Sequence, residues 1–305
     1  MTDRPGWPGA GRNPGRVLAV IVMGLAAVAL AVSACSGAGT AAAGAASGAS
    51  QPSGQPASPL ATPDIPGVPG QASHGTSPAS PATGPAAAPL AGKIIGIDPG
   101  HNGGNFTDPG AIARLIWNGT AWETCDTTGT TTDGGYPEAQ FTFNVARYLR
   151  ADLRRDGARV VMTRTSNNGV GPCVDRRAQI INDAHANVAV DIHADGGPAS
   201  GRGFTVLEPV ADGPNDAVIA TSQRFGGDVR QAMLAGTAMP VSDYTGVDGI
   251  MPRDDLAGLN LTTVPKVLVE CGNMRNATDA GLLVTARFQQ QVASALAAAI
   301  VRFLG

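Results

Sequence analysis

The chain has 305 residues and a formal net charge of −3. It contains no basic run and no alternation of basic with aromatic residues, so nucleic-acid binding is not expected. The length allows one or two domains. Composition divides the chain unevenly, because only the part after residue 90 has the pattern of a packed core.

The N-terminal segment has the pattern of an export signal. Arginines within residues 1–16 precede Val17–Val32, an uncharged apolar run at the short end for a bilayer span, and small residues follow it. The run ends in Val-Ser-Ala-Cys, which resembles a bacterial lipobox and predicts a signal over residues 1–35 with lipidation of Cys35. A signal cleaved nearby and an uncleaved membrane anchor remain alternatives. All three export the rest of the chain.

Residues 36–90 consist almost wholly of Ala, Gly, Ser, Pro, Thr and Gln, with Asp64 as the one charged residue. Such a segment cannot bury enough apolar surface to offset the entropy lost on ordering. We expect a flexible tether across the cell envelope, with His74 solvated. Residues 91–305 are then predicted to form a single domain with its own core, and a monomer is expected.

Patterns of strand and helix alternate along residues 91–305. Short apolar runs rich in β-branched residues predict buried strands at 93–98, 158–163, 188–192, 203–207 and 266–270. Helical patterns occur at 137–156, 175–184, 215–235 and from residue 280 onward. This alternation predicts an α/β fold with a mostly parallel central sheet and helices on both faces.

Polar residues follow three of the predicted strands. His101 ends the stretch GIDPGH, His193 lies in VDIHADGG, and Glu270 lies in VLVECGN. Ligands of parallel sheets gather beyond the carboxyl ends of the strands, and Glu138, in the first turn of a predicted helix, adds a second glutamate. Two histidines and a carboxylate with one open position form a hydrolytic zinc site, although other divalent metals accept these ligands. A further carboxylate is needed to move protons.

The order of these motifs resembles that of the zinc-dependent N-acetylmuramoyl-L-alanine amidases of the amidase-3 type, over almost all of residues 91–305. IDPGHNGG, YPEAQFTFNVA and VDIHADGG are similar to the three ligand motifs, and VLVECGNMRN is similar to the catalytic one. The resemblance implies one zinc ion held by His101, Glu138 and His193, with Glu270 as the catalytic carboxylate. It also implies the substrate, peptidoglycan, cut between N-acetylmuramic acid and the first L-alanine of the stem peptide. A lipid at Cys35 would attach the enzyme to the outer face of the membrane.

Some assignments have alternatives. Glu138 could instead stabilise the helix dipole, and Glu123 is a rival metal ligand. Asp98 is expected to shape the turn or to orient a ligand rather than to bind metal. Asp195 departs from the resemblance, because the family usually has asparagine there, and Cys271 follows Glu270 where an aliphatic residue or glycine is more common.

The cysteines of the predicted domain suggest one disulfide. Cys125 and Cys173 lie in loops of an exported chain, so we expect them to pair. Unpaired thiols, or a pairing that uses Cys271, remain open. A nucleophilic Cys271 is also possible, but it would leave His101 and Glu138 without a role. The Gly/Thr-rich insertion between residues 108 and 136 is predicted to form a hairpin or flap beside the metal.

Two other functions share these features. A non-catalytic envelope protein could keep the fold to bind peptidoglycan, although loss of a ligand would then be expected. A zinc endopeptidase or carboxypeptidase of stem peptides would use the same metal chemistry, and only the family motifs distinguish it from an amidase.

Overall fold

The computed structural model describes residues 88–305. The predicted signal, the lipidation of Cys35 and nearly all of the predicted linker lie outside these residues. Leu90, which composition assigns to the linker, is fully buried in the main core, and its backbone N–H donates to the Asp156 carbonyl at 2.8 Å. The folded unit therefore begins before Ala91. Among the helices of residues 88–305, none is both long and apolar enough to cross a membrane.

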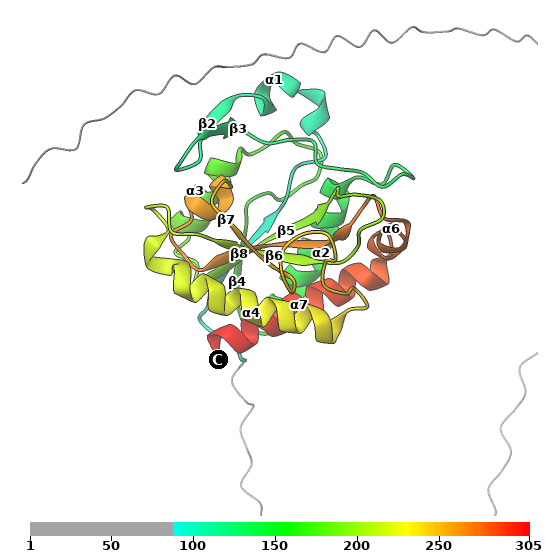
Figure 1. Cartoon of the computed structure of the whole chain (residues 1–305). Coiled ribbons are helices and arrows are strands. Elements are labelled where there is room, and N and C mark those ends of the chain that lie inside the picture. Colours follow the sequence, from blue (N-terminus) through cyan, green and yellow to red (C-terminus); the bar gives the residue numbers. More distant parts are fainter. Residues whose placement is uncertain (1–87) are drawn as a thin grey trace, which may run out of the picture. The chain divides into compact units, whose positions relative to one another are not determined.

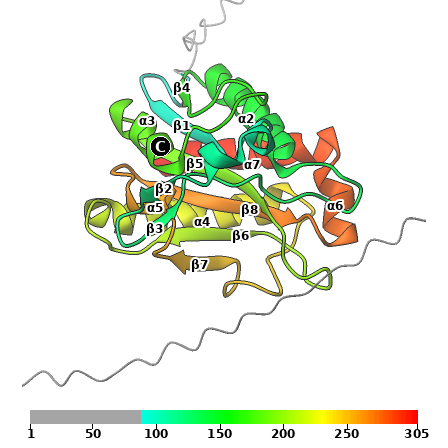
Figure 2. The ribbon, with the colours of Figure 1, turned by 90° about the horizontal axis from the view of Figure 1, so that it is seen from above.

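A six-stranded sheet lies at the centre, in the order β4-β1-β5-β8-β6-β7. Strands β4, β1, β5 and β8 are mutually parallel, β6 runs antiparallel to β8, and β7 is parallel to β6 (Figures 1 and 2). The mostly parallel sheet predicted from the sequence is confirmed. The bounds are β1 Ile94–Pro99, β4 Arg159–Met162, β5 Val188–Asp195, β6 Thr205–Pro209, β7 Ile250–Arg253 and β8 Lys266–Asn273.

Helices cover both faces of the sheet. Helices α2, α4 and α7 pack on one face and bury the main core, and α3 and α5 lie on the other (Figure 1). The bounds are α1 Pro109–Ile112, α2 Glu138–Arg155, α3 Val174–Asp183, α4 Ile219–Gly236, α5 Ala257–Asn260, α6 Ala277–Leu283 and α7 Ala286–Leu304, with short 3-10 turns η1 Asn105–Thr107 and η2 Asp216–Val218.

The alternation of side chains along each strand decides what faces the α3 side. Residues such as Ile97, Val190 and Val269 enter the main core under α2 and α7. Their strand neighbours on the opposite face include polar groups at the carboxyl ends of the strands. They are Asp98 of β1, Asp191 and His193 of β5, and Glu270 of β8. The sheet therefore gathers these side chains on the face that α3 and α5 leave partly open.

Several elements differ from the sequence prediction, among them the short helices α1 and α5, which it lacks. The single C-terminal helix is in fact two, because the Thr285 hydroxyl accepts from the Phe288 N–H and begins a new helix, α7. Strand β7 was missed because Pro252 interrupts its pattern, and a proline is tolerated there because β7 is an edge strand. The predicted hairpin in the insertion is present, with β2 Leu115–Trp117 paired antiparallel to β3 Trp122–Thr124.

Candidate metal centre and active site

The structure brings together three of the residues singled out by the sequence. His101 follows β1, Glu138 is the first residue of α2, and His193 lies near the end of β5. One potential ligand atom from each lies within 4.8 Å of the others. The two imidazole rings meet edge to face, with centroids 4.9 Å apart. This cluster is a group of side chains that could hold one metal ion.

Glu138 links the two histidines. Its Oε1 lies 2.9 Å from His193 Nδ1 and accepts from the Ala194 N–H at 3.1 Å. Its Oε2 accepts from the Thr130 N–H at 2.9 Å and lies 3.3 Å from His101 Nε2. Burial raises the pKa of Glu138, but the two imidazoles outweigh burial and lower that pKa well below 4.5. Glu138 is therefore held as a carboxylate.

The second nitrogen of each imidazole faces an aspartate. His101 Nδ1 lies 3.0 Å from Asp126 Oδ1. His193 Nε2 lies 3.3 Å from Asp191 Oδ1, an oxygen with no hydrogen bond elsewhere in residues 88–305. Carboxylates placed in this way fix the tautomer and the ring orientation of a metal-binding histidine. Each histidine thus directs one nitrogen towards Glu138 and the other towards an orienting carboxylate.

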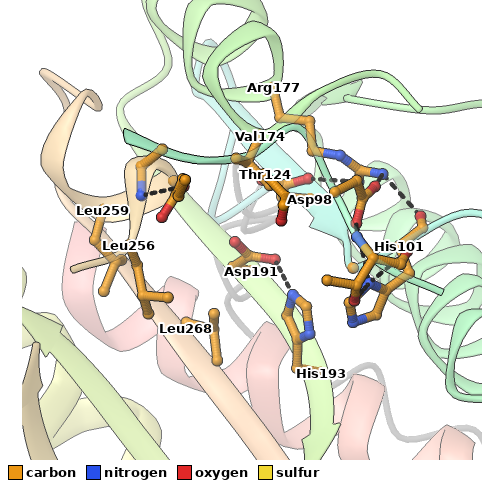
Figure 3. A pocket seen from close by; sticks show the side chains of 16 residues that line it. Asp98, His101, Thr124, Val174, Arg177, Asp191, His193, Leu256, Leu259 and Leu268 are labelled. Atoms are coloured by element: carbon orange, nitrogen blue, oxygen red, sulfur yellow. Dashed lines mark hydrogen bonds and ion pairs between the residues drawn. The ribbon is translucent and has the colours of Figure 1, made fainter. Parts of the chain in front are cut away.

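Two buried cations connect these aspartates through Asp98. Arg177 donates to Asp126 Oδ2 at 3.2 Å and to Asp98 Oδ1 at 3.1 Å. Lys266 Nζ lies 2.7 Å from Asp98 Oδ2 and 3.3 Å from Asp191 Oδ2. A continuous chain of charged groups therefore joins the two histidines beneath the cluster, and Figure 3 shows most of its members. Asp98 does not touch the histidines, so it acts on them only through its neighbours.

Glu270 faces the cluster from the neighbouring strand. It pairs in register with His193 across β5 and β8. Its Oε2 is buried and has no hydrogen-bond partner among residues 88–305. Burial, together with the charges of Glu138 and Asp195, raises the pKa of Glu270 to about 8. An unpartnered carboxyl with its pKa near neutral is suited to taking up and releasing a proton.

Two glycines leave room for the cluster because they carry no Cβ. A Cβ on Gly100 would lie 2.3 Å from the His193 ring, so only glycine fits beneath that imidazole. Gly129 has a φ of +71°, and a Cβ there would lie 2.7 Å from the His101 ring and 2.8 Å from Glu138. His101 itself has a φ of 56°, which is uncommon outside glycine and is often found at functional sites. The turn GIDPGH thus turns the chain sharply and aims the imidazole at Glu138.

A cavity of about 200 Å³ adjoins the cluster. Its polar wall includes His101, His193 and Asp191, and its apolar wall includes Leu256 and Leu268 (Figure 3). Another part of the wall comes from β3 and the residues that follow it, through Glu123, Thr124, Asp126 and Thr127. The cavity therefore reaches the two histidines of the cluster, and neither Glu138 nor Glu270 lines it.

Comparison with known proteins assigns the family. Residues 95–302 match the family described as N-acetylmuramoyl-L-alanine amidase (Amidase_3). The chain belongs to this family. It is 41% identical over 215 residues to the N-acetylmuramoyl-L-alanine amidase Rv3717 of Mycobacterium tuberculosis, covering 70% of this chain and 88% of that protein.

Solved structures agree in fold. The N-acetylmuramyl-L-alanine amidase Ami1 of Mycobacterium smegmatis is 42% identical with a TM-score of 0.67, covering 71% of this chain and 98% of the other. The apo form of Ami1 from Mycobacterium abscessus is 41% identical with the same TM-score, covering 71% and 100%. The family resemblance drawn from the motifs is confirmed, and so is the class of enzyme.

Glu123 and Cys271, the rival site residues of this amidase-family domain, lie where they serve the fold. Glu123 lies outside the cluster, and it accepts from the Asn118 side chain and the Ala257 N–H, so it fastens the hairpin to α5. Cys271 is fully buried on the opposite face of β8, in the main core, and burial raises the pKa of its thiol well above 9. A thiol placed there cannot reach the cluster as a nucleophile.

Asp195 stands where the family usually has asparagine, and Tyr244 accommodates this aspartate. The Tyr244 hydroxyl donates to Asp195 Oδ2 at 2.8 Å, and Asp195 Oδ1 accepts from the Gly196 N–H at 2.6 Å. Both carboxylate oxygens therefore have hydrogen-bond donors. His185 is exposed at the end of α3, away from the cluster.

Cys125 and Cys173 form a disulfide that joins the end of the hairpin to the start of α3. Backbone bonds reinforce the junction: the Val174 N–H donates to the Cys125 carbonyl at 2.9 Å, and the Cys125 N–H donates to the Arg114 carbonyl at 2.7 Å. Cys271 is the free cysteine of the described part of the chain. The disulfide holds the segment that carries Asp126 close to the cluster.

Sequence reasoning missed four residues of the buried charge chain: Asp126, Arg177, Asp191 and Lys266. Asp191 had a usable signal, since it precedes His193 by two positions in a strand and so shares its face. The other three had none, because a loop aspartate, a helical arginine and a lysine opening a strand are ordinarily solvated.

Proposed function

We propose that this chain is a zinc-dependent N-acetylmuramoyl-L-alanine amidase that hydrolyses the amide between N-acetylmuramic acid and L-alanine in peptidoglycan. The observation that carries the proposal is the cluster of His101, Glu138 and His193 facing the unpartnered carboxyl of Glu270. The family match supports the substrate.

The donor set fits zinc. Two imidazoles and one carboxylate are the protein ligands of many hydrolytic zinc sites, which leave a fourth position open. The contacts of 2.9 Å and 3.3 Å between Glu138 and the two rings suit atoms that share one small cation. Bound zinc would supply Lewis-acid chemistry, polarising the amide carbonyl and lowering the pKa of water. His101, Glu138 and His193 would hold the ion, and Asp126 and Asp191 would orient the rings.

Glu270 is proposed to move the protons of hydrolysis. Its carboxylate takes a proton from the attacking water, and the resulting acid gives that proton to the departing amine of L-alanine. Both the uptake and the release of the proton require a group whose pKa is close to the working pH. Burial raises the pKa of Glu270 to about 8. Because no donor in the described part of the chain is bonded to its Oε2, this oxygen is free to take up and release the proton.

The N-terminal assignments complete the proposal. Export through residues 1–35, lipidation at Cys35 and a tether over residues 36–90 would place the catalytic domain at the outer face of the cytoplasmic membrane, within reach of peptidoglycan. These assignments depend on sequence patterns alone. Metabolic labelling with a fatty-acid analogue tests them, since Cys35→Ala should abolish incorporation of the label.

The deciding experiment is a digest of purified peptidoglycan, with and without a chelator, analysed by mass spectrometry. An amidase releases free stem peptides that begin at L-alanine. Cuts within the stem peptide would instead identify an endopeptidase or carboxypeptidase, and no products at all would identify a binding protein. Activity that survives complete chelation would refute a metal mechanism.

Variants separate the two roles. Glu270→Ala should keep the metal and lose hydrolysis, whereas His101→Ala should lose both, as measured by metal analysis and by digest. The matched control is His185→Ala, an exposed histidine outside the cluster, which should keep both. Full activity in either site variant would overturn its assigned role.

A further inference from the structure

The β2–β3 hairpin carries an exposed aromatic face. Pairing in the hairpin places Trp117 opposite Trp122 and Leu115 opposite Thr124, and these four residues define what we call the hairpin face. Trp122 is 65% exposed, Leu115 59% and Trp117 48%. The two indoles meet at a tilt of 69°, with centroids 5.6 Å apart. Large apolar groups gathered on a surface in this way mark a binding site more often than a structural need.

The hairpin face is continuous with the cavity that adjoins the two histidines of the cluster. Thr124 belongs to that face and lines the cavity together with His101 and His193 (Figure 3). Figure 1 shows the hairpin on the side of the sheet opposite to α4 and α7, which is the side of the metal cluster. The indoles therefore extend one wall of the cavity outward from the cluster.

The hairpin is held in place before any ligand arrives. At its tip, Asn118 Oδ1 accepts from the Thr120 and Ala121 N–H groups, and Asn118 Nδ2 donates to the Asp255 carbonyl at 3.1 Å. At its base, Cys125 is bonded to Cys173. The exposure of the indoles is thus a property of an anchored element, and a preorganised surface loses little entropy on binding.

We propose that Trp117 and Trp122 bind the glycan strand of peptidoglycan, on the sugar side of the scissile amide. This inference rests on the proposed function, because an amide between a sugar-borne lactyl group and a peptide obliges the substrate to continue from the cavity as carbohydrate. An indole offers an apolar face to the C–H groups of a pyranose ring and an N–H donor to its hydroxyls. Residues 88–305 fall within one compact unit, so no separate module among them is available to hold the polymer.

Charge around the hairpin tip disfavours a lipid surface as the occupant. The charged residues near the tip are Asp212, Asp254 and Asp255, with Arg253 paired to Asp255 at 2.6 Å. Anionic membrane surfaces recruit clusters of Lys and Arg, and no such cluster adjoins the hairpin within the described residues. A glycan strand whose lactyl carboxyls are all in amide linkage carries no charge on its sugars and meets no repulsion there.

Calorimetric titration of the metal-free chain with a peptidoglycan oligosaccharide whose lactyl carboxyls are capped as simple amides, without stem peptides, tests the proposal without any turnover. Trp122→Ala and Trp117→Ala should each weaken binding about tenfold, the usual scale for removing an aromatic anchor from a binding site. Trp122→Phe should restore part of the affinity. The matched control is Leu234→Ala, an exposed leucine of α4 on the opposite face of the sheet, which should bind as the unchanged chain does.

Kinetics give a second readout. The indole variants should raise KM on polymeric substrate about tenfold with kcat unchanged, and should leave kcat/KM on a muramyl peptide with a single sugar unchanged. Equal oligosaccharide affinity in all variants would overturn the proposal. It would also be overturned if the indole variants lost binding to phosphatidylglycerol vesicles, or changed the oligomeric state, while keeping oligosaccharide affinity.

The outcome remains readable if the proposed function fails. If the chain cuts no muramoyl–alanine bond but Trp122→Ala still loses oligosaccharide binding, the glycan-binding surface is supported and only the amidase function is refuted. If the indole variants cut the bond normally, with unchanged KM on the polymer, the amidase function is supported and the glycan-binding surface is refuted.

Discussion

Replacing Glu270 by glutamine should stabilise the metal-free protein at alkaline pH. Within the folded residues 88–305 the buried Oε2 of Glu270 has no hydrogen-bond donor, and burial raises the pKa of this carboxyl from 4.5 to about 8. Between these two values the folded state binds a proton that the unfolded state has released. Stability therefore falls as pH rises from about 4.5 towards 8, and the full cost of ionising Glu270 is present above pH 8.

The magnitude follows from the pKa. Each unit corresponds to about 1.4 kcal/mol, so a rise from 4.5 to about 8 sets a ceiling of about 5 kcal/mol. Glu270 is only partly buried as a residue, so solvent screens part of its charge and about 2–3 kcal/mol is expected. Glu270→Gln removes the ionisation altogether, and its advantage should grow from near zero at about pH 4.5 to this value at about pH 8.5.

Urea unfolding of chelator-treated protein at both pH values measures the difference. The matched control, Asp183→Asn, removes an exposed carboxyl of α3 and should change the free energy of unfolding by less than about 0.5 kcal/mol at either pH. Zinc should reduce the advantage of Glu270→Gln, because a nearby cation compensates the carboxylate. An advantage that is the same at both pH values, or larger at the lower one, would refute the reasoning.

Three further results are expected. Asp191→Asn should weaken zinc binding about 10- to 100-fold in chelator competition, with Asp183→Asn as the unaffected control, because it removes the carboxylate that orients His193. Lys266→Met should lower the free energy of unfolding by about 3–5 kcal/mol, because it leaves two buried aspartates without this cation. The control Lys93→Met should change that free energy little. Equal losses in the two variants would contradict the buried network. The double variant Cys125→Ser, Cys173→Ser should lose up to about 4 kcal/mol, from the 48-residue separation, and reductant should then have no further effect on its unfolding.

The part of the site that lies at strand ends was predictable. A short apolar run followed by a polar residue identifies both the strand and the end at which the side chain emerges, and His101, His193 and Glu270 all satisfy that rule. Glu138 was predictable as the opening residue of a helix, because Pro137 precedes it. Strand direction then brings these ends to one edge of the sheet.

The supporting network was not predictable because its burial depends on contacts distant in sequence. Asp98 and Lys266 are separated by 168 positions, and Asp98 and Arg177 by 79. Nothing local distinguishes Arg177 from the solvated arginines of other helices, and Lys266 opens its strand as many solvated lysines do. The boundary of the linker failed at Leu90 for a similar reason, since a single leucine hardly alters local composition yet fills the core.

The two glutamates of the site show how one fold gives one type of side chain two roles. Glu138 sits between two imidazoles and accepts from two backbone N–H groups, so its pKa lies well below 4.5 and it stays ionised. Glu270 pairs in register with His193, and burial raises its pKa to about 8 at a carboxyl whose buried Oε2 has no donor among residues 88–305. The separation of these two pKa values, set by their surroundings rather than by residue type, supports the proposal that one carboxylate holds the metal and the other moves the proton.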